Sequence, residues 1–325
     1  MRTLLAGLGL LAALPGTAAA QRWVILDAGA GSSRHQLGPA GSAVSVSPRV
    51  LWLGRLGYVD ASGLYTRGTA LGWNAELHGS GGVFVRPHSR LTLDLGAEWV
   101  WTGHRHGKRT SEALLRPTAR LELGRSELSV GLAVGRAGLS LGGELLRGSP
   151  AVDPDTGSQA PPPADPRHSE TRSFSRGTFD GVTRAGPFEL RGRITRTRFG
   201  QRALRAGALW NPQDPSADTL FKYYVTTYDD ALIGAGWSNR LLRVTATVEQ
   251  RFGQREFRSR AWHLEGAASL TRDLTLFGAT GRTLSRLTVD LPARGYATAG
   301  LRWTIGPRKP SLPPAERRVP ASFRV

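Results

Sequence analysis

Apolar and polar side chains alternate in the segment from Arg90 to Trp101, and alternation of this kind recurs along most of the chain. Its odd positions carry Leu91, Leu93, Leu95, Ala97, Trp99 and Trp101, and four of its even positions carry Thr92, Asp94, Gly96 and Glu98. Successive side chains of a β-strand point to opposite faces, so this pattern predicts a strand with one apolar and one polar face. Two carboxylates on the polar face argue against its burial in the core of a soluble protein.

The same pattern returns at residues 71–78, 242–251, 262–270 and 297–305. Segments of roughly ten residues, separated by turn residues, are typical of transmembrane β-barrels. The sequence therefore predicts an all-β protein, a single antiparallel up-and-down transmembrane barrel of about 14 strands, within a range of roughly 12 to 16. The range reflects residues 41–70 and 200–237, each of which allows one hairpin more or fewer.

Two kinds of connection separate the expected strands. Short turns are expected at residues 87–89, 125–126, 185–187, 238–240 and 271–273, and longer polar loops at 102–112 and 147–172. Short and long connections largely alternate between residues 87 and 187. Outer-membrane barrels have short periplasmic turns and longer extracellular loops, so this asymmetry supports the barrel prediction.

Residues 1–20 have the layout of an export signal. Arg2 precedes an apolar run from Leu4 to Leu14, and Ala18 to Ala20 offer a small-residue cleavage site before Gln21. We therefore expect a secretory signal peptide that is removed after about Ala20. No run of 18 or more apolar residues follows, so no transmembrane helix is expected. The chain has no cysteine, which excludes disulfides and a lipid anchor on an N-terminal cysteine.

The chain is strongly basic, with 43 Lys and Arg against 25 Asp and Glu and a formal net charge of +18. Export argues against nucleic acid as the partner. The phosphates of lipopolysaccharide are the nearer anionic partner, because they lie on the membrane where the barrel would reside. Arginine carried on solvated faces without a specific partner is the alternative that the composition leaves open.

On these alternating segments the chain resembles the general class of Gram-negative outer-membrane β-barrel proteins, which are porin-like in architecture. The resemblance covers residues 22–305 and rests on the pattern alone, so it transfers no functional residue. It implies bacterial outer-membrane localisation, contact with outer-membrane lipid and lipopolysaccharide, and insertion by the barrel-insertion machinery. The expected division is a signal peptide at 1–20, the barrel at 21–305, and a Pro- and Arg-rich tail at 306–325. The chain departs from the class at its end, because that tail follows Ile305 where such proteins commonly end on an aromatic strand residue.

The polar faces of the expected strands form the presumed lining of the lumen. These residues are Asp94, Glu98, Arg120, Glu122, Glu189, Arg191, Arg193, Arg243, Glu249, Arg251, His263, Glu265 and Arg302. In a wide barrel they would line water, and the excess of basic residues in the chain as a whole would favour anions. In a narrower or plugged barrel they would pair across the lumen as a salt-bridge network.

Aromatic residues near the two ends of the expected strands predict two girdles at the membrane interfaces. The presumed interface aromatics are Phe84, Trp99, Trp101, Phe188, Trp237, Trp262 and Trp303. Aromatic rings also favour strands in general, and this simpler explanation of their placement stays open.

Three stretches of the sequence partly match the motifs of a catalytic, a cofactor-binding and a metal-binding site. Residues 138–142 read Gly-Leu-Ser-Leu-Gly around Ser140, but no helix follows as a nucleophile elbow requires. Residues 23–31 open like a dinucleotide-binding unit, but Arg34 stands where the third glycine belongs. His104 and His106 lack a nearby carboxylate before Glu112. We therefore predict no catalytic residue, no cofactor and no metal.

The function that the sequence favours is a passive, porin-like channel for small solutes, with anions as the preferred class. Within the same fold, the alternative is a non-conducting structural or adhesion barrel that displays the loop at 147–172. Outside that fold, a soluble exported β-sandwich or β-barrel that binds an anionic ligand remains an alternative. A hydrolase embedded in a barrel also remains open, although no serine, histidine and acid set can be assembled from the sequence.

Overall fold

The computed structural model describes residues 21–35, 41–68, 72–104, 109–141, 168–200, 227–253, 258–286 and 294–306. Within them, fourteen strands are β1 (Gln21–His35), β2 (Gly41–Leu53), β3 (Gly57–Gly68), β4 (Gly72–His88), β5 (Leu91–His104), β6 (Arg109–Leu123), β7 (Ser126–Leu141), β8 (His168–Ala185), β9 (Phe188–Phe199), β10 (Thr227–Ser238), β11 (Leu242–Gly253), β12 (Arg258–Ser269), β13 (Leu274–Arg286) and β14 (Arg294–Ile305). The expected signal peptide, most of the expected tail and the proline-containing part of the loop at 147–172 lie outside the described residues.

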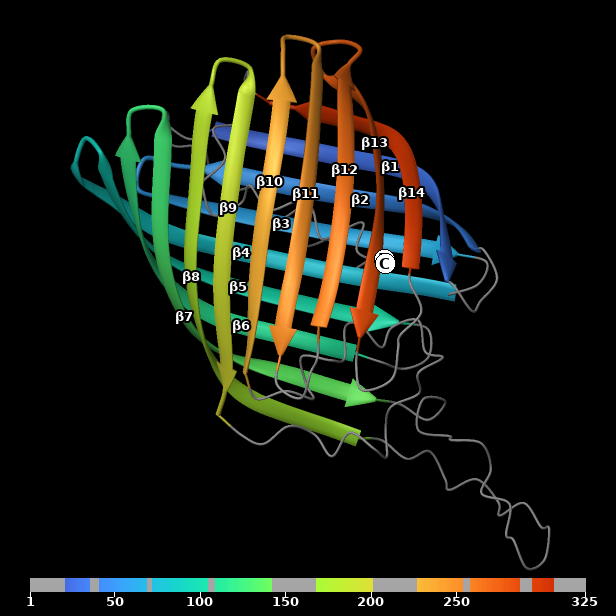
Figure 1. The fold of residues 1–325 in the computed structure, drawn as a ribbon, viewed down its shortest axis with the longest axis horizontal. Helices are drawn as coiled ribbons and strands as arrows, with labels where there is room; N and C mark the ends of the chain where they lie inside the picture. The colour runs from blue at the N-terminus through green and yellow to red at the C-terminus, as the bar shows by residue number, and fades with distance from the viewer. Residues whose placement is uncertain are drawn as a thin grey trace, which may run out of the picture.

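The strands form one closed barrel in which each strand pairs with its neighbours in the sequence and β14 returns to β1. All of these pairs are antiparallel. Figure 1 shows β8–β13 crossing in front of β1–β6 at a steep angle, as the tilted strands of opposite barrel walls must do. The predicted all-β, up-and-down barrel of about 14 strands is confirmed.

No helix in the described part of the chain is long and apolar enough to cross a bilayer.

At one end of the barrel, short connections join successive strands. They comprise residues 54–56, 89–90, 124–125, 186–187, 239–241 and 270–273. Figure 1 shows those after β8, β10 and β12 along the upper edge. The start of β1 and the end of β14 lie at this same end, which we call the short-turn end. We call the opposite end the loop end, because its connections include residues 142–167 and 200–226.

Local chemistry explains two of the short turns. In the β8–β9 turn Gly186 has a φ of 59°, and Pro187 follows it. Glycine adopts this conformation without steric strain, and proline has no N–H that a strand pairing would need. In the β10–β11 turn the Asn239 side-chain Oδ1 accepts hydrogen bonds from the backbone N–H groups of Leu241 and Leu242, at 2.8 and 2.7 Å.

We expect Gly186→Val to destabilise the barrel by about 1–2 kcal/mol, because a β-branched residue is strained at positive φ. Urea unfolding of the refolded barrel measures this loss. Gly192→Val is the matched control, since Gly192 faces outward in β9 and a Cβ there would meet its nearest atom at 4.0 Å. Equal losses in both variants would contradict the explanation from turn geometry.

The two faces of the barrel wall differ in chemistry. Outward positions are apolar and exposed, as at Ile233 (73% exposed), Leu132 (64%) and Ile194 (60%). Inward positions alternate with them and are buried or half-buried, although many carry polar or charged groups. An apolar outer face around a polar interior is the arrangement that a membrane barrel requires.

Two prolines interrupt the hydrogen-bond ladders. The β2–β3 register skips Ser47 and Pro48, and the β6–β7 register skips Arg116 and Pro117. Proline has no N–H to donate, so each costs one ladder bond. The strands continue past both sites, because the ladder on the other side of each proline is unbroken.

Candidate functional site: the barrel interior

The strand registers place every presumed lumen-lining residue on the inner face. They are Asp94, Glu98, Arg120, Glu122, Glu189, Arg191, Arg193, Arg243, Glu249, Arg251, His263, Glu265 and Arg302. For example, Glu249 pairs with Leu232 and Ala261, and all three are buried.

The same registers bring further charged residues to the inner face. They are Asp27, Arg49, Asp60, Glu76, His78, Glu112, Arg116, Glu127, Arg172, Arg176, Asp180, Arg184 and Asp230. Over the described interior as a whole, carboxylates are therefore at least as numerous as arginines. The described interior therefore does not account for the excess of arginine in the sequence.

Ion pairs along the wall join these residues. Pairs between adjacent strands are Arg49 with Asp60 (2.9 Å), Arg116 with Glu98 (3.6 Å), Arg120 with Glu127 (3.0 Å), Arg184 with Glu189 (3.1 Å) and Arg302 with Asp27 (2.7 Å). The His78 ring also lies 3.5 Å from Glu98. Arg176 reaches past β7 to Glu112 at 3.4 Å. These pairs thus run around the wall between strands that are close in the barrel order.

The junction of β1 and β14 closes the barrel, and one of these pairs lies on it. The Arg302 guanidinium donates from Nε and Nη2 to the two carboxylate oxygens of Asp27, at 2.8 and 2.7 Å. Such a two-bond pair fixes orientation as well as charge. The same guanidinium lies 5.7 Å from the centre of the Phe277 ring, so the contact extends to β13.

Near the loop end, aromatic rings and guanidiniums alternate on the inner face of β8–β11. The Phe174 and Phe199 rings are 6.0 Å apart, and the Phe199 and Tyr228 rings 6.2 Å apart. Arg172 lies 4.7 Å from the Phe199 ring centre, Arg176 5.0 Å from that of Phe174, and Arg251 5.7 Å from that of Tyr228. Arg251 also pairs with Asp230 and with Glu249. We call these six residues (Arg172, Phe174, Arg176, Phe199, Tyr228 and Arg251) the aromatic–arginine cluster.

Cation–π contacts and desolvated ion pairs of this kind hold side chains in fixed positions. All three rings are buried. The aromatic–arginine cluster is therefore a rigid part of the interior wall close to one mouth of the barrel.

The presumed interface aromatics fall on the outer face with one exception. Phe188 and Trp237 are direct partners near the short-turn end, where Trp303 also lies. Trp99, Trp101 and Trp262 lie toward the loop end. Phe84 differs from the expectation, because it pairs with Asp94 and so shares the inner face with that carboxylate. A shift of one residue along a strand moves a side chain to the other face of the sheet. Closeness to a turn in the sequence therefore does not determine which face an aromatic residue occupies.

Sequence patterns missed the inner residues of β8 and β10. In β8 the inward Arg172, Phe174 and Arg176 alternate with outward Ser173 and Ser175. The alternation that signals a membrane strand depends on apolar outward residues, and these outward serines provide none. No hydrophobic periodicity could have revealed this part of the interior.

Two of the three motifs lie on strands. Ser140 is in β7, opposite Arg109 and Ser169, and residues 23–31 form part of β1. The side chains of His104 and His106 lie outside what the structure describes. Among the residues that it does describe, no three His, Asp or Glu side chains gather as a metal site would require.

No protein-family model matches the chain, and no curated protein matches it in sequence. Solved barrel structures do match. The CymD monoaromatic hydrocarbon channel is 8% identical, with a TM-score of 0.51 over 89% of each chain. A loop L8 deletion mutant of OmpT, an outer membrane protein of Vibrio cholerae, is also 8% identical, with a TM-score of 0.51 over 88% of this chain and 100% of that one. At such low identity the likeness establishes the fold, which is that of outer-membrane β-barrel proteins, and the predicted resemblance is confirmed.

Proposed function

We propose that this protein is a porin-like channel of the bacterial outer membrane, through which small solutes pass passively and without chemical change. The observation that carries the proposal is the closed barrel whose outer face is apolar and whose interior is polar and charged. A polar interior is the lining that a water-filled channel requires. The similarity to the CymD channel supports the same reading.

The preference for anions stays a prediction. The ion pairs of the inner face limit how strong this preference can be. Inner arginines such as Arg116, Arg120 and Arg251 each lie against a carboxylate, so the fields of these charges largely cancel over the width of a lumen. We therefore propose a channel with weak charge selectivity. Solutes would be sorted chiefly by size and by their fit to the polar wall.

A second candidate is the non-conducting barrel, and one observation favours it. Several inner side chains are almost completely buried, including Trp23, Asp60, Arg172 and Thr197. An interior packed this closely in a continuous layer would block solutes.

Planar-bilayer recording of the purified mature chain distinguishes the two candidates. We expect discrete conductance steps with a small anion preference in a gradient of potassium chloride. Arg251→Ala removes the partner of Asp230 and Glu249 and leaves two neighbouring carboxylates, so it should shift the reversal potential toward cation selectivity. Bilayers that stay silent with heat-modifiable, folded protein would overturn the channel proposal in favour of the closed barrel.

A further inference from the structure

The outer face of the barrel carries charge at the loop end and almost none elsewhere. Its outward strand positions there hold a set of exposed arginines that we call the arginine belt: Arg67, Arg109, Arg136, Arg196, Arg198, Arg260 and Arg282. Asp229 is the one carboxylate on an outward position of the described strands, and it pairs with Arg196. The other belt arginines form no ion pair with any described residue.

The belt lies at a constant depth on five strands. Eight residues separate the arginine from an outward apolar residue near the short-turn end in Val59–Arg67, Leu128–Arg136, Phe188–Arg196, Arg260–Ala268 and Leu274–Arg282. Eight residues extend about 27 Å along a strand, or about 20 Å along the membrane normal at the usual tilt. The long arginine side chain covers the remaining distance to the headgroups of the far leaflet. The spacing therefore places the belt at the membrane interface of the loop end.

Tryptophans lie at the same level. Arg67 pairs directly with Trp73, and Arg282 pairs directly with Trp262. Arg136 pairs with Ala113, whose other partner is Trp99. Tryptophan is enriched where a membrane barrel meets the headgroups, so the rings support the depth that the spacing gives.

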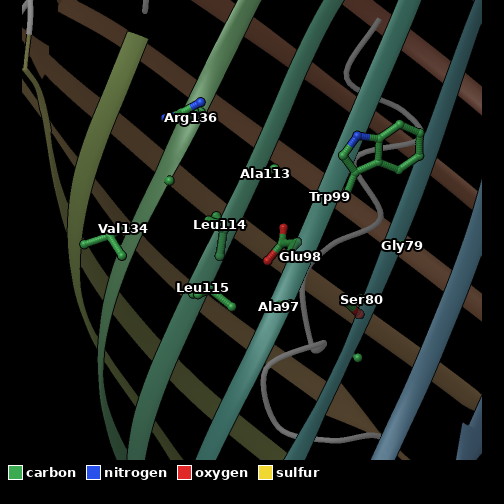
Figure 2. Close-up of a pocket in the computed structure, with 12 residues that line it drawn as sticks. Gly79, Ser80, Ala97, Glu98, Trp99, Ala113, Leu114, Leu115, Val134 and Arg136 are labelled. Atoms are coloured by element: carbon green, nitrogen blue, oxygen red, sulfur yellow. The ribbon is translucent and has the colours of Figure 1, made fainter. Parts of the chain in front are cut away.

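Below one belt arginine the outer wall is hollowed. The hollow spans β4–β7, has a volume of about 600 Å³ and is bordered by Trp99, Leu115 and Val134, with Arg136 at its rim. Figure 2 shows Arg136 above Val134, and the direction of β7 places Arg136 nearer the loop end. The floor consists of small outward residues, including Gly79, where an added Cβ would meet no atom within 4 Å. We call this hollow the outer-wall groove.

We propose that the outer-wall groove and the adjacent belt arginines bind lipopolysaccharide. An acyl chain of its lipid A portion lies in the apolar groove, and a lipid A phosphate accepts hydrogen bonds from the Arg136 guanidinium. Arg109 lies on the neighbouring strand, four residues nearer the loops than the partner of Arg136, and faces the phosphate and sugar groups beyond. The inference rests on the proposed outer-membrane location, in which the loop end faces the outer leaflet.

Charge complementarity selects this lipid over a phospholipid. Guanidinium groups bind phosphates through paired hydrogen bonds, and a belt almost free of carboxylates suits a headgroup with more than one phosphate. Phosphatidylethanolamine carries an ammonium group as well as its phosphate. The belt offers that ammonium group almost no acceptor, so a zwitterionic headgroup fits it poorly.

Lipid titration into the purified mature barrel in detergent, followed by native mass spectrometry, tests the proposal. The probes are lipid A with its two phosphates, dephosphorylated lipid A and phosphatidylethanolamine. We expect the wild-type barrel to bind lipid A most tightly. Arg109→Ala combined with Arg136→Ala should weaken that binding about tenfold, through the loss of charge-assisted contacts. Gly79→Leu should weaken binding of all three probes, because the new side chain fills the groove.

Matched control variants make the same kinds of substitution at other places on the barrel. Arg125→Ala combined with Arg272→Ala takes two arginines from the short turns, and Gly266→Leu adds a side chain at another open position of the outer wall. Both should bind lipid A like the wild type. Unchanged lipid A affinity after loss of Arg109 and Arg136, or equally tight binding of phosphatidylethanolamine, would overturn the lipopolysaccharide site. Wild-type conductance is measured separately, so a silent barrel that binds lipid A would remove the channel proposal alone.

Discussion

Ile233→Arg should prevent stable membrane insertion of the barrel, with a loss of about 2–4 kcal/mol in the free energy of folding into a bilayer. Ile233 is 73% exposed and faces outward from the middle of β10. Its partner Gly192 lies midway between Phe188 and Arg196, so an arginine here would sit in the hydrocarbon, far from either interface. Refolding into phosphatidylcholine vesicles followed by urea titration measures the loss.

The control for this variant places the same charge outside the apolar band. Thr171 is exposed and outward on β8, six residues nearer the loops than the Gly177 partner of Arg196. Thr171→Arg should cost no more than about 1 kcal/mol, as charged residues do near the interface. A soluble β-protein predicts a different result, since an arginine replacing an exposed side chain in water changes stability by about 0.5 kcal/mol or less. Equal stability of both variants would therefore refute the membrane location.

Arg302→Ala should destabilise the barrel by about 2 kcal/mol, because it leaves the Asp27 carboxylate without its partner at the junction of the first and last strands. The Asp27 side chain is only 13% exposed, and Arg302 is 35% exposed, so the expected loss lies between those of a buried and a surface pair. The loss should appear as a lower urea midpoint. It should also lower the temperature at which the heat-modifiable gel band shifts.

The outer face supplies a matched control for the pair at the junction. Arg196 and Asp229 form the same two-bond geometry, at 2.8 and 3.0 Å, but their side chains are 57% and 36% exposed. Arg196→Ala should therefore cost less than about 1 kcal/mol. If the two arginine variants lose the same stability, burial at the junction contributes nothing beyond an ordinary surface ion pair.

Individual strands were predictable where the outward residues are apolar. Leu93, Leu95 and Trp99 alternate with Asp94 and Glu98, and the structure places these two sets on opposite faces of β5. The sequence alternation did not place Phe84, which lies close to a turn but on the inner face, and it gave no signal for Arg172 and Arg176. Near Phe84, closeness to a turn did not determine which face the side chain occupies. Around Arg172 and Arg176, the outward neighbours are serines, so apolar and polar residues do not alternate there.

The face that each charged side chain occupies, and the residue with which it pairs, could be assigned only from the assembled barrel. The chain has an excess of arginine, and the sequence alone assigned part of that excess to the interior. The registers instead match inner arginines with carboxylates such as Glu98, Glu127 and Asp230, and they place a separate set of arginines on the outer face at the loop end. A shift of one residue in register would exchange these two sets, since side chains alternate between faces.

The sequence by itself determined the strand period, the turns and the antiparallel barrel class, because these depend on the local alternation of apolar and polar residues and on turn chemistry. The tertiary structure alone decided which charges meet and where the outer wall is hollow. Asp27 and Arg302 are 275 residues apart, and the outer-wall groove is assembled from four strands. Both depend on barrel closure and strand register, which join residues that no local pattern relates.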